Sequence, residues 1–151
     1  MRLAVLVMVF SAAGAAHAQA VDPDTLRMKL GHWMVKQSGH GLPFAVEYHA
    51  CAGRDGDYVV TEEEGCTKPT LKREGTGYVV EWVCAAGRGG KAFRRLVITG
   101  DFNSAYTERK TTTFKPPLDG FTTVTENVEW RWIAPKCKPG MSSGDVEMIS
   151  K

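Results

Sequence analysis

Cysteine offers the widest choice of chemistry in this sequence, because a thiolate can bind a metal, attack a substrate or form a disulfide. The four cysteines are Cys51, Cys66, Cys84 and Cys137. None of their spacings is C-x-x-C, the pattern expected of a redox-active pair or of half a zinc site. An even number of widely spaced cysteines is typical of structural disulfides in an exported protein. The sequence therefore predicts two disulfides and no catalytic cysteine.

Three of the four histidines, His32, His40 and His49, follow the N-terminal segment. They form no local metal-binding motif, since they lie eight and nine residues apart. Pairing between the strands that hold His32 and His49 would bring these two side chains together. The nucleophile motif G-x-S-x-G and the phosphate-binding motif G-x-x-x-x-G-K are both absent. We therefore assign no catalytic residue, no metal site and no cofactor, and we expect a protein that is not an enzyme.

The N-terminus has the pattern of a cleaved secretory signal. Arg2 precedes an apolar run over residues 3–10, and small residues then form two A-x-A sites that place the cleavage after residue 18 or 20. The apolar run is shorter than the roughly 20 residues that a membrane-spanning helix needs. We therefore expect residues 1–18 to be a signal peptide, and the mature protein to be periplasmic or secreted without stable membrane insertion. We also expect a monomer.

The charge of the mature chain is almost balanced. Without residues 1–18, which contain one basic residue, 18 lysines and arginines stand against 17 acidic residues. Proteins that bind nucleic acid normally carry a clear basic excess on one face, so the composition argues against a nucleic-acid partner. We expect a single β domain over residues 21–137 and a flexible C-terminal tail, rich in glycine, serine and charge, over residues 138–151.

The elements that must position these residues are strands. Turn residues interrupt the chain about every ten residues, and β-branched and aromatic residues alternate with polar ones between them. This pattern is typical of an antiparallel all-β domain. We expect strands near residues 32–37, 43–51, 58–61, 70–73, 78–84, 92–99, 103–114 and 122–133, and a short helical turn at 24–30. Such an up-and-down meander of seven or eight strands either closes into a small barrel or stays a curved open sheet.

Alternation along these strands also predicts which side chains share the buried face. The predicted core residues are Trp33, Phe44, Val46, Tyr48, Tyr78, Val80, Trp82, Leu96, Ile98, Val128, Trp130 and Trp132. Each tryptophan can bury roughly 200 Å², so the four of them would supply much of the core.

Hairpin geometry suggests how the cysteines pair. Residues equidistant from a tight turn lie opposite each other, and Cys66 and Cys84 are equidistant from Gly75. A three-residue loop at 74–76 would bring their Cα atoms within the roughly 4.4 to 6.8 Å that a disulfide spans. By elimination, Cys51 would pair with Cys137.

A series of single residues recurs in an order that resembles a known family. The residues are Gly31, Trp33, Cys51, Cys66, Gly75, Trp82, Cys84, Gly100, Asp101, Tyr106 and Cys137. Over most of the mature chain they resemble the small exported bacterial proteins catalogued as domain of unknown function 3617. The resemblance implies an exported, disulfide-bonded β domain and implies no activity. The chain departs from the family at Gly75-Thr76-Gly77, where Gly-Asn is common, and at Trp130-Arg131-Trp132.

A second resemblance is to lipocalin-like barrels. The segment Gly31-His32-Trp33 enters the first strand, and Arg131 lies on the last. In lipocalin-like barrels an arginine stacks on such a tryptophan and closes one end of the barrel. This resemblance implies a barrel closed by Trp33 and Arg131.

The surplus of aromatic residues, in a chain without catalytic motifs, favours a non-catalytic binding module. Its concave face would hold a small apolar ligand or a peptide segment. The residues expected to face the ligand or the core are Trp33, Tyr48, Trp82, Trp130, Arg131 and Trp132. The alternative is a scaffold in the cell envelope that contacts a partner protein or inhibits an enzyme. A hydrolase is the least supported of the three hypotheses.

Overall fold

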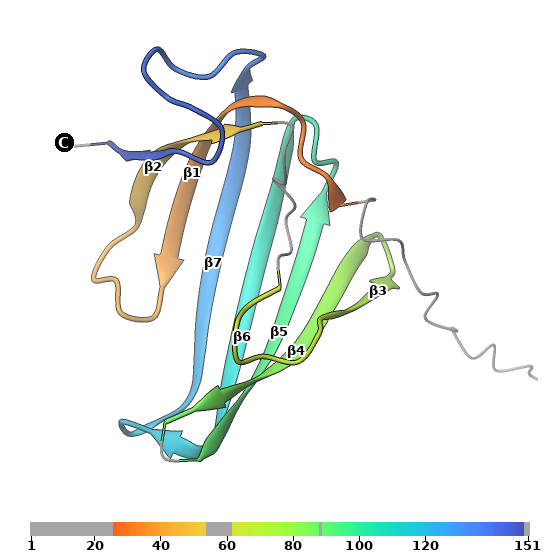
Figure 1. The fold of residues 1–151 in the computed structure, drawn as a ribbon, viewed down its shortest axis with the longest axis vertical. Coiled ribbons are helices and arrows are strands. Elements are labelled where there is room, and N and C mark those ends of the chain that lie inside the picture. The colour runs from red at the N-terminus through yellow and green to blue at the C-terminus, as the bar shows by residue number, and fades with distance from the viewer. Residues whose placement is uncertain (1–25, 54–61, 88, 150–151) are drawn as a thin grey trace, which may run out of the picture.

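The computed structural model describes residues 26–53, 62–87 and 89–149, and within them eight strands form one antiparallel sheet without an α-helix (Figure 1). The strands are β1 (Gly31–Gly39), β2 (Val46–Ala52), β3 (Thr70–Glu74), β4 (Gly77–Ala86), β5 (Gly90–Gly100), β6 (Ala105–Leu118), β7 (Phe121–Ala134) and β8 (Val146–Met148). No helix in these ranges is long and apolar enough to cross a membrane. The strand predicted at 58–61 lies outside the described residues.

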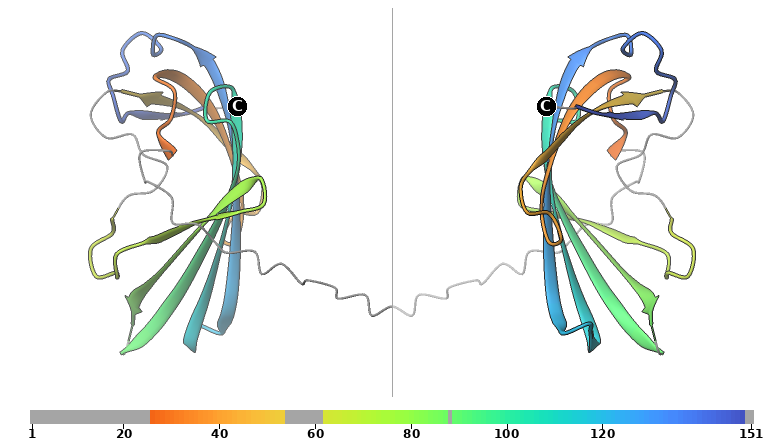
Figure 2. Two further views of the ribbon diagram at one scale, coloured as in Figure 1. Left: turned by 90° about the vertical axis from the view of Figure 1, so that its right-hand side faces the viewer. Right: turned by 90° about the vertical axis from the view of Figure 1, so that its left-hand side faces the viewer.

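The strand order in the sheet is β3-β4-β5-β6-β7-β1-β2-β8. Successive hairpins build β3 to β7, and the β1–β2 hairpin then joins the far side of β7 through β1. The two edge strands, β3 and β8, do not pair with each other, so the sheet is curved and open (Figure 2). The all-β meander is confirmed, and the closed-barrel form of the prediction is wrong.

The concave face carries the core, as alternation along the strands predicts. Trp33 is fully buried and lies opposite Trp132 of β7, while Val35 lies opposite Trp130. The Leu26–Leu30 segment lies on this side of the sheet, and Leu26 and Met28 pack into the same cluster (Figure 2). Of the helical turn predicted at 24–30, the described part has a 3₁₀ conformation only at Leu26, and the irregular chain that follows packs against core side chains.

Most of the predicted core is confirmed, and the exceptions are Val46, which is half-buried and lies outside the core cluster, and Phe44. Its side chain is 73% exposed, because β2 begins only at Val46 and Phe44 lies in the loop before it. The alternation that fixes a side chain to one face applies only within a paired strand. Two buried aromatic residues were missed, Phe102 and Tyr106, which pack against each other with ring centroids 5.2 Å apart.

Part of the tail that we expect to be flexible, residues 138–151, forms strand β8. β8 pairs with β2, placing Val146 opposite Ala50 and Met148 opposite Tyr48. Backbone hydrogen bonds between Cys51 and both Gly144 and Asp145 continue this pairing. A strand of three residues is too short to show a hydrophobic period, so the sequence pattern carries no signal for it.

Both predicted disulfides form, Cys66–Cys84 and Cys51–Cys137. The hairpin between β3 and β4 differs from the predicted three-residue loop, since Glu74 pairs with Gly77 around the two-residue turn Gly75-Thr76. Gly75 has a φ of 60°, a left-handed conformation that favours glycine in tight turns. An isolated bridge shifted by one residue from the hairpin register then brings Cys66 opposite Cys84.

The barrel-closing pair suggested by the lipocalin resemblance does not form. Arg131 lies opposite Met34, the neighbour of Trp33, so its side chain is on the convex face and exposed. Lys29 supplies a cation at a related position, with its Nζ 3.5 Å from the ring centroid of Trp132. The N-terminal segment therefore provides the cation over Trp132.

Candidate functional site

A cavity of about 220 Å³ lies on the concave face, where β1, β2, β4, β5, β6 and β7 contribute side chains. Its walls include Gln37, Tyr48, Trp82, Leu96, Glu108, Val128 and Trp130. The cavity therefore joins aromatic and aliphatic surface to a few polar groups, as small-molecule sites usually do. At roughly 30 Å³ per water molecule, it has room for about seven waters or for one small organic molecule.

A stack of aromatic rings fixes the wall of the cavity at Trp130. Trp130 and Tyr106 are stacked, with ring planes 10° apart and centroids separated by 5.3 Å. The fully buried Trp33 meets both of these rings edge-on, at centroid separations of 5.5 and 6.4 Å. Because such contacts lock side-chain rotamers, the face of Trp130 that lines the cavity is held in place.

Four buried polar atoms on this face have no hydrogen-bond partner among the described residues: Trp82 Nε1, Trp130 Nε1, Arg94 Nε and Tyr106 Oη. The other two tryptophans are satisfied, since Trp33 Nε1 donates to the carbonyl of Lys29 at 2.8 Å and Trp132 Nε1 donates to the carbonyl of Leu30 at 3.1 Å. A buried donor without a partner costs roughly 1 to 3 kcal/mol. The unsatisfied tryptophan donors are thus the two that line the cavity.

Glu108 is a titratable group that the fold perturbs strongly at the cavity. Burial raises the pKa of its carboxyl group from 4.5 to about 7, and the indole of Trp130 and the charge of Lys110 offset part of this rise. The N–H of Trp130 nevertheless makes no hydrogen bond of normal geometry. Near neutral pH, a large fraction of Glu108 therefore carries a proton and can donate a hydrogen bond.

Two ion pairs border the cavity. Glu63, from the loop before β3, binds the guanidinium of Arg94, and that guanidinium lies 5.9 Å from the ring centroid of Trp82. Lys110 Nζ lies 2.6 Å from a carboxylate oxygen of Glu126, its cross-strand partner. Since both pairs are internally balanced, the net charge of the cavity wall is set by Glu108.

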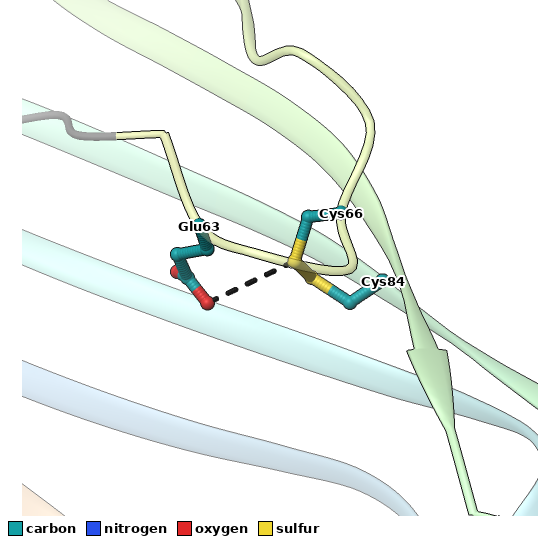
Figure 3. Close-up of side chains that lie close together, drawn as sticks. All are labelled: Glu63, Cys66 and Cys84. Atoms are coloured by element: carbon teal, nitrogen blue, oxygen red, sulfur yellow. Dashed lines mark hydrogen bonds between the residues drawn. A yellow bond between two sulfur atoms is a disulfide. The ribbon is translucent and has the colours of Figure 1, made fainter.

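The Glu63 carboxylate also lies beside the Cys66–Cys84 disulfide, as Figure 3 shows. The carboxylate oxygen and the two sulfur atoms are close enough to suggest a metal site. The sulfur atoms are bonded to each other, however, and offer no thiolate. With no proton on Cys66 Sγ, its 3.9 Å approach to Glu63 is a contact between a polarizable sulfur and an acid. This cluster is structural.

A second hollow, of about 310 Å³, lies on the convex face. Its walls are formed mainly by exposed or half-buried side chains such as Lys36, Glu47, Glu129 and Arg131. Tyr106 and Trp130 border it too, but their rings stack within the core on the other face. Although this hollow is larger, the concave cavity is the better candidate site, because both unpartnered indoles, Trp82 and Trp130, line it and their rings pack against the core on that face.

The predicted ligand-facing residues divide into three groups. Tyr48, Trp82 and Trp130 line the concave cavity. Trp33 and Trp132 support it from within the core, and Arg131 lies on the opposite face. The polar residues of the cavity were missed, among them Glu108. Their signal was present in β6, where Glu108 and Lys110 share the strand face of the buried Tyr106.

Comparisons with protein-family models, with curated proteins and with solved structures find no match to this chain. Function must therefore be inferred from the site. The two disulfides point to an oxidising, extracytoplasmic environment, because thiols in the cytosol are kept reduced.

Replacing Tyr106 by phenylalanine is expected to leave the free energy of unfolding unchanged or to raise it by up to about 1 kcal/mol. The ring and its stack with Trp130 remain, while the variant removes a buried hydroxyl that has no partner. Urea unfolding of ligand-free protein, followed by tryptophan fluorescence, measures the difference. A loss of more than about 1 kcal/mol would mean that the hydroxyl is satisfied by tightly bound water.

Proposed function

We propose that this protein is a non-catalytic binding module that holds one small ligand in the concave cavity. The observation that carries the proposal is the pair of unpartnered indole N–H groups, Trp82 and Trp130, on the wall of a cavity large enough for a small organic molecule. Buried donors are nearly always hydrogen-bonded in folded proteins, so two unpartnered donors on one cavity wall are explained if a bound molecule accepts from them. Aromatic side chains beside a few fixed donors are also the usual composition of such a site.

The donors and the charge balance favour one class of ligand. Two indoles and the protonated form of Glu108 all donate hydrogen bonds, so the ligand should carry acceptor oxygens such as a carbonyl or an ether. Leu96 and Val128 offer apolar surface to the rest of the molecule. An uncharged ligand with an apolar body fits best, because the ion pairs of the wall are already balanced.

We further propose that the protein acts in the periplasm or outside the cell, after removal of residues 1–18. The two disulfides support this location. The resemblance to domain of unknown function 3617 agrees with export and adds no activity.

Native mass spectrometry of protein purified gently from its own compartment tests the binding function. We expect a fraction of the protein to carry a noncovalent mass, and we expect that fraction to fall about tenfold or more in a Trp82→Phe/Trp130→Phe variant, which removes both free donors. The matched control is Trp132→Phe. The indole of Trp132 already donates to the carbonyl of Leu30, so this variant should leave the bound fraction unchanged. Under denaturing conditions the intact mass also fixes the cleavage site.

A bare chain in every preparation, or equal loss of ligand in the Trp132→Phe control, would contradict the proposal. The first result would mean that water serves the free donors. The second would mean that the tryptophans act through stability.

An interaction scaffold is the second candidate function. Phe44 is 73% exposed in the β1–β2 loop, and Phe121 is 46% exposed at the start of β7. The ring of His40 contacts Phe121, so both loops lie toward the same end of the sheet. Exposed aromatic residues at one end of a rigid sheet suit contact with a partner protein. A Phe44→Ser/Phe121→Ser variant that still captures the same partner would exclude this surface.

A further inference from the structure

A pair of histidines lies on the convex face, opposite the cavity, and is used by neither proposed function. His32 of β1 and His49 of β2 occupy diagonal positions on adjacent strands, since His32 pairs with Cys51 and Met34 pairs with His49. His32 Nε2 and His49 Nδ1 are 2.9 Å apart and share a hydrogen bond. Both side chains are partly exposed, so the pair is open to solvent.

The third strand of this region adds a carboxylate. Glu147 of β8 lies directly opposite His49 and therefore on the same face of the sheet. Its carboxylate is bound by Lys138, whose Nζ lies 2.5 Å from Oε1. The chain at Lys138 is held in place because its neighbour Cys137 is bonded to Cys51, two residues from His49. Three neighbouring strands thus place two imidazoles and one carboxylate on the same face of the sheet.

From this arrangement we infer that His32, His49 and Glu147 form a binding site for a borderline divalent transition-metal ion such as Cu²⁺ or Zn²⁺. Two imidazoles and a carboxylate are a donor set that such ions take, with water completing the coordination. The site is independent of the concave cavity and of any ligand held there.

The separation of the two nitrogens fits the coordination geometry of these ions. With metal–nitrogen bonds of about 2.0 to 2.1 Å, two ligands at 90° lie about 2.9 Å apart, and two tetrahedral ligands lie about 3.3 Å apart. The observed 2.9 Å therefore equals the spacing in a tetragonal site and is a few tenths of an ångström short for a tetrahedral one. Binding would require both side chains to rotate so that their lone pairs, which now share a hydrogen bond, turn toward one ion.

Metal binding by the two imidazoles requires no net release of protons. In the metal-free pair one imidazole donates its ring proton to the other. On metal binding that proton moves to the other nitrogen of the same ring, so each imidazole offers one lone pair and no net proton is released.

Lys138 competes with a metal ion for the carboxylate of Glu147. Its ammonium group occupies the Glu147 carboxylate and repels a cation nearby. A Lys138→Met variant keeps most of the side-chain length and removes the charge, so it should bind the metal more tightly than the wild type. A variant that misfolds would bind the metal more weakly, so a gain in affinity distinguishes a metal site from a merely structural histidine pair.

Isothermal titration of the mature protein with CuCl₂ and with ZnCl₂ tests the inference. We expect saturable 1:1 binding, tighter for Cu²⁺ than for Zn²⁺. Affinity should fall by more than about tenfold in His32→Gln and in His49→Gln, and it should rise in Lys138→Met. The control is His40→Gln, because His40 lies outside the cluster beside Phe121 and should not change the affinity.

The result that overturns the inference is an affinity in His49→Gln equal to that of the wild type, or no saturable binding of either ion. Thermal unfolding of each variant checks that the sheet is intact. If His49→Gln does not fold, the Lys138→Met result decides: tighter binding supports the site, and unchanged or weaker binding excludes it.

Discussion

Removing the Cys51–Cys137 disulfide is expected to lower the free energy of unfolding by about 4 to 5 kcal/mol, and removing Cys66–Cys84 is expected to lower it by only about 3 kcal/mol. A disulfide stabilises mainly by restricting the unfolded chain, and this effect grows with the length of the closed loop. The two loops differ widely, with sequence separations of 86 and 18 residues. The long bridge ties β2, near one edge of the sheet, to the chain that follows β7.

Double alanine variants of each cysteine pair, unfolded in urea, measure this difference. They should be compared with the intact protein at the same pH, without reductant. Equal losses in the two variants would show that residual structure in the unfolded state, and not loop length, sets the contribution of each bridge.

The second large effect is a pH dependence that comes from Glu108. The pKa of this carboxyl is about 7 in the folded protein and 4.5 as its ordinary value, so the folded state binds its proton more tightly than the unfolded state does. The contribution of Glu108 to the free energy of unfolding is therefore fully present below pH 4.5. It decreases as the pH rises from 4.5 and is lost as the pH passes through 7. Over this range the loss approaches about 3 kcal/mol, at 1.36 kcal/mol for each pKa unit.

A Glu108→Gln variant isolates this contribution, because glutamine keeps the shape and the hydrogen-bonding capacity of the protonated acid. The variant should gain about 3 kcal/mol relative to the wild type between pH 4.5 and pH 8 in urea unfolding experiments. Other groups titrate alike in both proteins and cancel in the comparison. Parallel stability curves for the two proteins would show that the ionised carboxylate is well solvated in the cavity.

The fold was predictable where local rules act over long strands. The 14 residues of β7 alternate clearly enough to fix both faces, and this pattern placed Val128, Trp130 and Trp132 correctly. The Cys66–Cys84 bridge was also predicted, although the hairpin turn has two residues and the bridge is shifted by one residue. The pairing was still predicted correctly, because a disulfide can span a range of Cα–Cα distances.

The parts that could not be predicted depend on contacts between distant segments. The pairing of β8 with β2 is set by the bridge at Cys137 and by backbone hydrogen bonds, neither of which leaves a periodic pattern. The choice between barrel and open sheet depends on whether the edges β3 and β8 meet, which strand alternation does not encode.

The candidate site was only half predictable for a related reason. Aromatic residues such as Trp82 and Trp130 were identified from their position on the core face. Glu108 was missed because an acid at an inward position breaks the alternation used to assign faces. A polar residue at such a position marks either a sheet end or a site, and the fold is needed to distinguish the two.

The most direct test of ligand binding compares the four indole N–H signals of the protein in ¹H–¹⁵N NMR spectra. One sample is gently purified protein, and the other is the same protein after unfolding in denaturant and refolding with its disulfides intact, which strips any ligand. We predict that the signals of Trp82 and Trp130 move and that those of Trp33 and Trp132, which are bonded to backbone carbonyls, do not. Identical spectra, or equal movement of all four signals, would contradict a ligand in the concave cavity.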